Sequence, residues 1–136
     1  MSYSDGIAIR LLGSSPTFSH SQLINGGGRC IVIESGIVRN NLIDARNYYG
    51  TWSDCEIALY GNSNIFENNT VYGILSSVAT ATDNNNIVNN TFSGCRSTYG
   101  CIRILTWDSN SDDNNTIANN TITDSDVGIK LSLIHI

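Results

Sequence analysis

The sequence predicts an all-β solenoid of about six stacked coils, and three observations indicate this fold class. First, a short pattern recurs four times along the 136 residues: an apolar residue, any residue, Asn-Asn, then usually Thr and another apolar residue. Second, an alternating triplet, apolar-x-apolar, recurs in step with that pattern, and third, no stretch keeps a helical period. Repeats of roughly 20 to 30 residues, each too small to bury its own apolar face, are typical of a solenoid.

The triplets predict one strand in each coil, because their alternation has the period of a strand with one buried face. They are Ile7–Ile9, Ile31–Ile33, Ile57–Leu59, Val78–Thr80, Ile102–Ile104 and Ile129–Leu131. Val78–Thr80 is an atypical member that keeps the spacing, with steps of 24, 26, 21, 24 and 27 residues between first positions. Stacked in parallel about 4.8 Å apart, six coils would form a rod on the order of 25 to 30 Å long.

The Asn pairs predict a sharp turn between two further short strands of a coil. Asn tolerates the left-handed backbone conformation better than any residue except Gly. In stacked coils, Asn side chains at equivalent turns lie one above another and can form a hydrogen-bonded ladder. The pairs are Asn40-Asn41, Asn68-Asn69, Asn89-Asn90 and Asn119-Asn120. Four glycosylation sequons, at Asn68, Asn89, Asn114 and Asn119, accompany this pattern. The ladder is the favoured interpretation, because the repeat already explains the spacing.

These residues resemble the right-handed parallel β-helix repeat proteins of the pectate-lyase-like superfamily. Their repeat pattern is most similar to the NosD-type repeats of that superfamily. The Asn-Asn-Thr-apolar runs carry the resemblance together with Asp5–Ile9 and Gly128–Leu131, and it covers nearly all of residues 5 to 131. It implies a single right-handed parallel β-helix domain over residues 1–130. It implies no single activity, because the superfamily includes polysaccharide lyases, hydrolases, epimerases, phage tailspikes, adhesins and accessory proteins of copper enzymes.

The two ends of the sequence suggest a truncated fragment. Residues 131–136 resemble translated sequencing-adapter sequence, and we expect them to be a non-native tail; the alternative is a genuine final strand. Neither end resembles the cap that a solenoid core requires. We therefore expect self-association through uncapped ends.

Composition limits the partners of the chain. A formal net charge of −5 with only 7 basic residues provides no field for nucleic acid. An apolar run of 18 residues, as a membrane span needs, does not occur, nor does a signal peptide pattern. For the native full-length protein, the family resemblance implies an extracellular, cell-surface or periplasmic location.

The four cysteines leave two alternatives open. Cys95 and Cys101 could pair across a return loop in an oxidising compartment. The alternative, which we favour, is that Cys30, Cys55, Cys95 and Cys101 are small buried residues, as free cysteines often are. Their spacing fits no zinc pattern.

A repeated loop motif predicts a binding surface. R-x-x-Y-G occurs at Arg46–Gly50 and at Arg96–Gly100, after the Asn strand of two coils. The outward middle positions of the triplets read Ala8, Val32, Ala58, Ala79, Arg103 and Lys130. Guanidinium forks suit carboxylates, and aromatic faces suit sugar rings. The predicted ligand is an acidic polysaccharide, held by Arg46, Tyr49, Arg96, Tyr99, Arg103 and Lys130. The alternative is that the tyrosines pack the loops and the cations are simply exposed.

A cofactor is not expected, with calcium as a weak candidate. Asp108, Asn110 and Asp112 have the spacing that opens an EF-hand calcium loop, but Asp113 stands where that loop needs Gly, and Asn119 where it needs Glu. The alternative is a solvated turn. Copper is disfavoured, because Met1 is the only Met and His20 the only credible His ligand.

The sequence shows no complete catalytic constellation, so whether the protein is an enzyme stays open. Asp112 and Asp113 are neighbours, but successive strand residues point apart. The His and the R-x-K clamp of polygalacturonase-like members are missing. The leading hypothesis is a carbohydrate-binding β-helix. The alternatives are part of a polysaccharide lyase, hydrolase or epimerase, and the structural shaft of a tailspike or adhesin.

Overall fold

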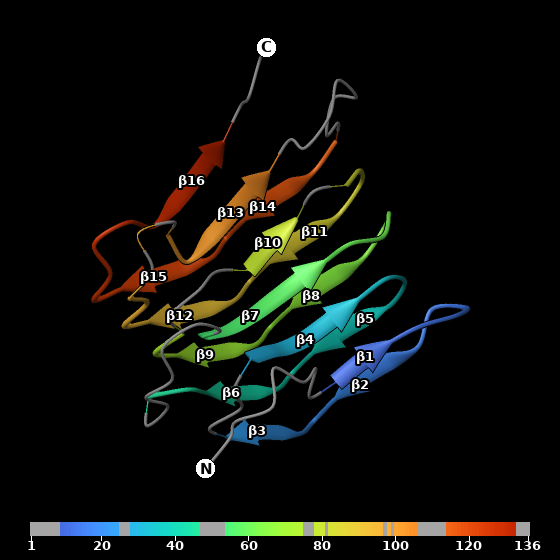
Figure 1. Ribbon diagram of the computed structural model, residues 1–136, viewed down its shortest axis with the longest axis horizontal. Coiled ribbons are helices and arrows are strands. Elements are labelled where there is room, and N and C mark those ends of the chain that lie inside the picture. Colours follow the sequence, from blue (N-terminus) through green and yellow to red (C-terminus); the bar gives the residue numbers. More distant parts are fainter. Residues whose placement is uncertain are drawn as a thin grey trace.

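The chain forms a right-handed parallel β-helix, as predicted (Figure 1). The structure is a computed structural model that describes residues 9–24, 28–46, 54–74, 78–80, 82–96, 98, 100–105 and 114–132. Within these residues every regular element is a strand, and every strand pair is parallel. The strands form three sheets that run along the stack.

Sheet A contains one strand from each of six coils, in the order β1 (Ile9–Leu11), β4 (Gly28–Ile33), β7 (Asp54–Leu59), β10 (Val78–Thr80), β13 (Ile102–Leu105) and β16 (Ile129–Ser132). Sheet B contains β2 (Thr17–Ser19), β5 (Ile37–Arg39), β8 (Ile65–Glu67), β11 (Asn86–Val88) and β14 (Thr116–Ala118). Sheet C contains β3 (Gln22–Ile24), β6 (Leu42–Asp44), β9 (Thr70–Tyr72), β12 (Thr91–Ser93) and β15 (Thr121–Thr123). A coil therefore runs from sheet A through B to C, and coil 1 begins with β1.

The triplet pattern predicted sheet A correctly in five coils and was wrong in the first. Ile9, and not Ile7, is the partner of Ile31, so the first triplet is Ile9-Arg10-Leu11. Ile9 fits both triplets, and an alternation of period two cannot separate two registers that differ by two residues. Ile7 and Ala8 lie outside the described residues. The middle position of coil 1 is thus Arg10, whose Nε donates to Glu34 Oε1 at 3.1 Å.

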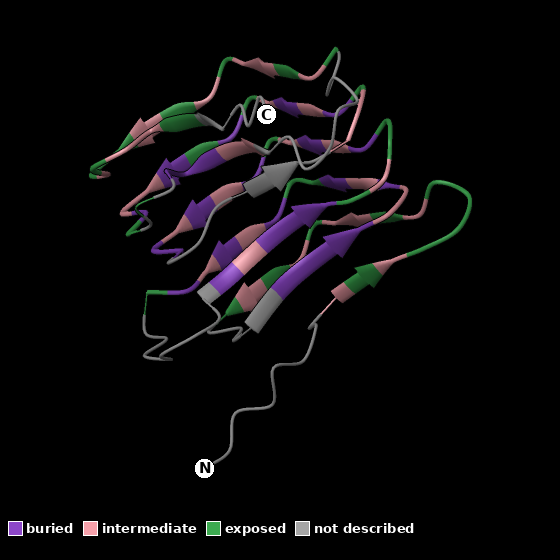
Figure 2. Cartoon of the chain, turned by 45° about the horizontal axis from the view of Figure 1, so that its top comes forward, coloured by how far each residue is buried: buried purple, intermediate pink, exposed green. Residues whose placement is uncertain are grey.

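The inward residues of the three sheets form one core along the axis (Figure 2). In coils 2 and 3 and in sheets B and C of coil 4 these side chains are fully buried, and the Phe66 and Phe92 rings stack with their centroids 6.5 Å apart. The equivalent side chains of the first coil and of coil 5 are only partly buried: Ile9, Leu11, Phe18, Leu23, Ile117 and Ile122. A buried position thus requires a neighbouring coil on both sides, as in other solenoids.

The two residues of each Asn pair have different roles at the turn between sheets B and C. The first residue has the left-handed conformation, with φ of 56°, 53°, 57° and 55° at Asn40, Asn68, Asn89 and Asn119. The second residue points inward and forms the predicted ladder. The backbone N–H groups of Asn41, Asn69 and Asn90 donate to the side-chain Oδ1 of the next pair at 3.0, 2.9 and 2.9 Å.

A second ladder, which we did not predict, follows the turn between sheets A and B. Its members are Asn64, Asn85 and Asn115, joined by backbone N–H to Oδ1 bonds of 2.9 and 2.8 Å. The N–H of Gly36 extends it into coil 2 by donating to Asn64 Oδ1 at 2.9 Å. The residues before the three asparagines, Ser63, Asn84 and Asn114, have left-handed backbones. The sequence signal was an Asn placed just before three strands of sheet B, β8, β11 and β14.

Candidate functional site

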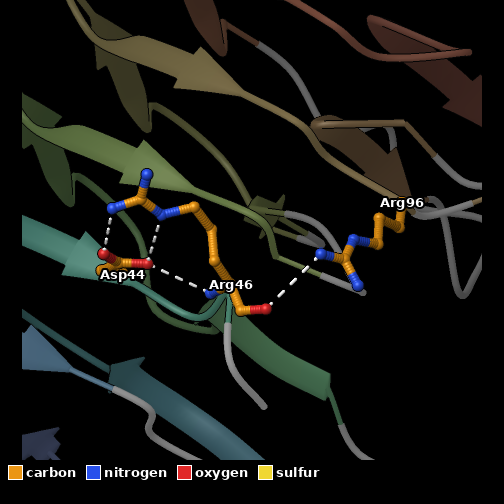
Figure 3. Close-up of polar contacts among 3 residues, drawn as sticks. All are labelled: Asp44, Arg46 and Arg96. Atoms are coloured by element: carbon orange, nitrogen blue, oxygen red, sulfur yellow. Dashed lines mark hydrogen bonds and ion pairs between the residues drawn. The ribbon is translucent and has the colours of Figure 1, made fainter. Parts of the chain in front are cut away.

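Arg46 lies at the corner where sheet C ends, and its guanidinium contacts Asp44 and Tyr72. Figure 3 shows the contact with Asp44. The Nε and Nη2 of Arg46 donate to the two carboxylate oxygens of Asp44 at 2.9 and 2.6 Å, and its backbone N–H donates to Asp44 Oδ1 at 3.1 Å. The guanidinium carbon also lies 4.5 Å from the centre of the Tyr72 ring. The sheet register explains this contact, because Asp44 and Tyr72 are cross-strand partners.

Gly73 makes room for the Arg46 side chain. A Cβ atom at position 73 would lie 2.7 Å from Arg46 Cγ and 2.9 Å from Arg46 Cα. Gly73 also has φ of 63°, a left-handed conformation that favours glycine. The turn after β9 therefore supports the position of Arg46 from the next coil.

The ion pair shifts both titrations. The bidentate hydrogen bond from Arg46 lowers the pKa of Asp44, although burial of the carboxylate acts in the opposite direction. The same pair raises the pKa of Arg46. The carboxylate-binding fork of Arg46 is thus already engaged by Asp44 within the chain.

Asp44→Asn is expected to destabilise the chain at neutral pH and to have little effect in acid. The pKa of Asp44 lies below its ordinary value of 3.8, so the ion pair contributes fully above that pH, and the contribution is lost as the pH falls through the lowered pKa. Urea unfolding of both proteins between about pH 2 and pH 7 measures this difference. A difference in stability that stays constant over the whole range would contradict this interpretation.

Arg96 follows β12 and contacts the Arg46 backbone (Figure 3). Its Nη2 donates to the carbonyl oxygen of Arg46 at 3.4 Å, a long hydrogen bond. Arg96 is exposed and forms no ion pair with the residues that the structure describes. Its guanidinium has five N–H donors, and most of them remain available to an anion.

A disulfide joins the two residues that flank the segment 96–100. Cys95 and Cys101 are bonded, with their Cα atoms 5.5 Å apart, and the Cys95 N–H donates to Ser125 Oγ at 3.1 Å. This is the pairing that the sequence left open, and the favoured alternative of unpaired cysteines is wrong. Because the bond joins the end of β12 to the start of β13, it holds Arg96 at the corner from which the strand of Arg103 begins.

A second disulfide, between Cys30 and Cys55, was not predicted. Cys30 stands one residue before its triplet and Cys55 two before, so the plain repeat does not place them opposite each other. The register between β4 and β7 shifts on both sides of Arg29, and Cys55 has a left-handed φ of 49°. This irregularity brings the two Cα atoms to 4.7 Å.

Arg103 and Lys130 are side by side, as predicted, because they are partners across β13 and β16. Arg103 is partly buried and Lys130 is exposed. The predicted outward strip is not open over its whole length, since Val32 and Ala58 are 1% and 0% exposed. Sheet A therefore has cationic middle positions at both ends of the stack, Arg10 in coil 1 and the Arg103 and Lys130 pair in coils 5 and 6, and a covered surface in coils 2 and 3.

Several predicted site residues lie outside the described residues: Tyr49, Tyr99, Asp108, Asn110 and Asp112. The calcium loop therefore stays a prediction. Among the described residues, no group of three or more His, Cys, Asp or Glu side chains is arranged to hold a metal ion. In the same residues there is no helix of the length and apolarity that crossing a bilayer requires.

Sequence reasoning missed Asp44 and Tyr72. The Asp-x-Arg spacing of Asp44 and Arg46 was a usable signal, because residues i and i+2 at a strand end can meet across a turn. Tyr72 could be identified as a neighbour of Arg46 only from the register between β6 and β9. The chain has no significant match among protein family models, curated proteins or solved structures.

Proposed function

We propose that the chain belongs to an exported parallel β-helix protein and binds an acidic polysaccharide at the corner around Arg96. The observation that carries the proposal is which of the basic side chains have a carboxylate partner. Arg10, Arg39 and Arg46 each pair with a carboxylate of the chain, whereas Arg96 contacts only a carbonyl oxygen among the described residues. In a chain of formal net charge −5, an exposed guanidinium without a carboxylate partner favours an external anion.

The surroundings of Arg96 suit a sugar chain. The Arg46 guanidinium lies over the Tyr72 ring and is bonded to Asp44, so it offers a positioned planar group beside Arg96. Fixed groups bind with a smaller loss of side-chain entropy than mobile ones. Arg103 follows Cys101 by two residues, and with its cross-strand partner Lys130 it adds formal positive charge near this end of the stack.

The two disulfides support export, because such bonds persist in oxidising compartments. Membership of the pectate-lyase-like superfamily, with NosD-type repeats, is part of the same proposal, and it is supported by the parallel three-sheet fold and the Asn ladders. Self-association through the ends remains a prediction. It is supported by the exposure of Leu12, Ile24 and Ile129, which are 53%, 54% and 48% exposed.

A structural shaft is the second candidate function, and the two ladders favour it. They connect coils 2 to 5 through buried and partly buried bonds from backbone N–H groups to Asn side chains, and they make the stack uniform along its length. A shaft needs length and rigidity and no ligand. Binding measurements therefore separate the two candidates.

Arg96→Gln is expected to weaken binding of polygalacturonate, measured by titration calorimetry at low salt, by about ten- to a hundredfold. This is the loss of one charge-assisted hydrogen-bonded contact of about 1.5 to 3 kcal/mol. Arg39→Gln is the matched control, because it removes the same charge from sheet B, where Arg39 lies 3.9 Å from Glu67. Equal affinities of wild type and Arg96→Gln would refute the site, and no binding by the wild type would favour the shaft.

A further inference from the structure

We infer that the exposed asparagines at the turn between sheets B and C are N-glycan acceptor sites. Asn68, Asn89 and Asn119 each begin an Asn-Asn-Thr sequon and lie in successive coils at the same turn. Asn114 begins a fourth sequon at the other turn. The inference goes beyond the proposed function and shares with it only the expectation of export.

The acceptor residues are separate from the ladder residues. Asn68, Asn89 and Asn119 are exposed, and their side chains make no hydrogen bond to the described part of the chain. The buried bonds are made by the asparagine that follows each of them, such as Asn69 and Asn90. A group attached to the first asparagine therefore leaves the ladder intact, and the repeat and the sequon do not compete.

The third residue of each sequon is accessible as well. Thr91 and Thr121 are exposed and Thr70 is half-buried, all on the outer face of sheet C. The left-handed backbone of the acceptor turns its side chain out at the corner while the next residue turns in. Each sequon thus lies on a surface turn, where an attached oligosaccharide extends into solvent.

The two disulfides are an independent observation that points to the same compartment. Disulfides form in the secretory route, where N-glycosylation also takes place. The donor is a lipid diphosphate-linked oligosaccharide, and the host transferase catalyses the step. The asparagine Nδ2 forms a bond to C1 of the first sugar, the bond between C1 and the phosphate oxygen breaks, the amide loses one proton, and the lipid diphosphate leaves.

The spacing of the coils limits occupancy. Neighbouring coils lie about 4.8 Å apart, which is less than the width of a sugar chain. Glycans on Asn68 and Asn89, or on Asn89 and Asn119, would therefore collide at their first sugars. We expect a folded chain to carry glycans at no more than two of these three positions, and at Asn114 independently.

The test is translation of the full chain behind a cleavable signal peptide in the presence of microsomal membranes, followed by amidase release and peptide mapping. We expect modification at Asn114 and in the row of acceptors formed by Asn68, Asn89 and Asn119 at the turn between sheets B and C. Thr91→Ala should abolish it at Asn89, and Thr91→Ser should retain it. Asn40 lies in the same row with φ of 56° but has Leu42 at the third position, so Leu42→Thr should create a new acceptor.

An imported chain that carries no glycan at any of the four sequons would overturn the inference. An unmodified Asn40 in Leu42→Thr would overturn it as well. Transfer occurs on the entering chain, so these outcomes do not depend on whether a variant folds well. Secreted protein from cultured cells then measures occupancy in the folded state. Glycans on all three of Asn68, Asn89 and Asn119 in one folded molecule would refute the limit set by the coil spacing. Polysaccharide binding is measured on unglycosylated chain, so its failure is distinct from failure here.

Discussion

Asn69→Ala is expected to lower the free energy of unfolding by about 3 to 5 kcal/mol, because it leaves several buried polar groups without partners. Asn69 Oδ1 accepts from the backbone N–H and the Nδ2 of Asn41 at 3.0 and 3.1 Å. Its Nδ2 donates to the Val38 carbonyl at 3.0 Å and to Asn90 Oδ1 at 3.2 Å. Alanine provides none of these bonds, and the site is closed to water because Asn69 is 1% exposed.

Urea unfolding followed by circular dichroism measures this loss. Asn68→Gly is the matched control, since it changes the adjacent residue, keeps the left-handed φ of 53° accessible and removes no buried hydrogen bond. We expect the control to stay within about 1 kcal/mol of wild type. A loss of similar size in both variants would mean that the turn, and not the ladder, stabilises the stack.

Gly61→Ala is expected to be the other severe substitution, with a loss of about 3 kcal/mol or more. A Cβ atom at position 61 would overlap the carbonyl oxygen of Glu34 and would lie 2.5 Å from its carbonyl carbon. Both are backbone atoms of the preceding coil, so the clash cannot be relieved by the movement of a flexible side chain. The coils would have to separate at a point where the Gly61 N–H donates to the Ile33 carbonyl.

Gly128→Ala provides the comparison for Gly61→Ala. A Cβ at position 128 would meet only the Ile122 side chain, at 3.5 Å, which is an ordinary contact. Thermal unfolding of both variants should therefore show a large decrease of the midpoint for Gly61→Ala and a small one for Gly128→Ala. Equal midpoints would show that the two coils are less tightly stacked at Gly61 than the structure describes.

The repeat made most of the fold predictable from sequence. A triplet of period two recurs in six coils and an Asn pair in coils 2 to 5. Each has a single physical reason, a buried face for the triplet and a sharp turn for the pair. The first triplet was misplaced because Ile9 satisfies two registers and only pairing with Ile31 decides between them. The second ladder was missed because its three asparagines share no common run: Asn64 is followed by Ile65 and Asn85 by Asn86, and of the three only Asn115 stands in an Asn-Asn-Thr run.

The candidate site was less predictable, because it depends on neighbours in other coils. Arg46 and Arg96 could be named from a repeated motif, and the structure brings them together. Arg46 contacts Asp44 and Tyr72, whereas Arg96 has no such partners among the described residues. This difference depends on side-chain geometry and strand register, which the motif does not specify. The Cys30–Cys55 bond depends on an irregular register, which a repeat pattern by its nature does not contain.

The most direct test of the coil register, which carries the whole account, is disulfide mapping of the oxidised chain by mass spectrometry of unreduced peptides. The structure requires two bonds, Cys30 to Cys55 between neighbouring coils and Cys95 to Cys101 across the loop after Arg96. Those two pairs, without others, would support both the stacking of coils 2 and 3 and the position of Arg96. Any other pairing, such as Cys30 with Cys95, would contradict the register and with it the candidate site.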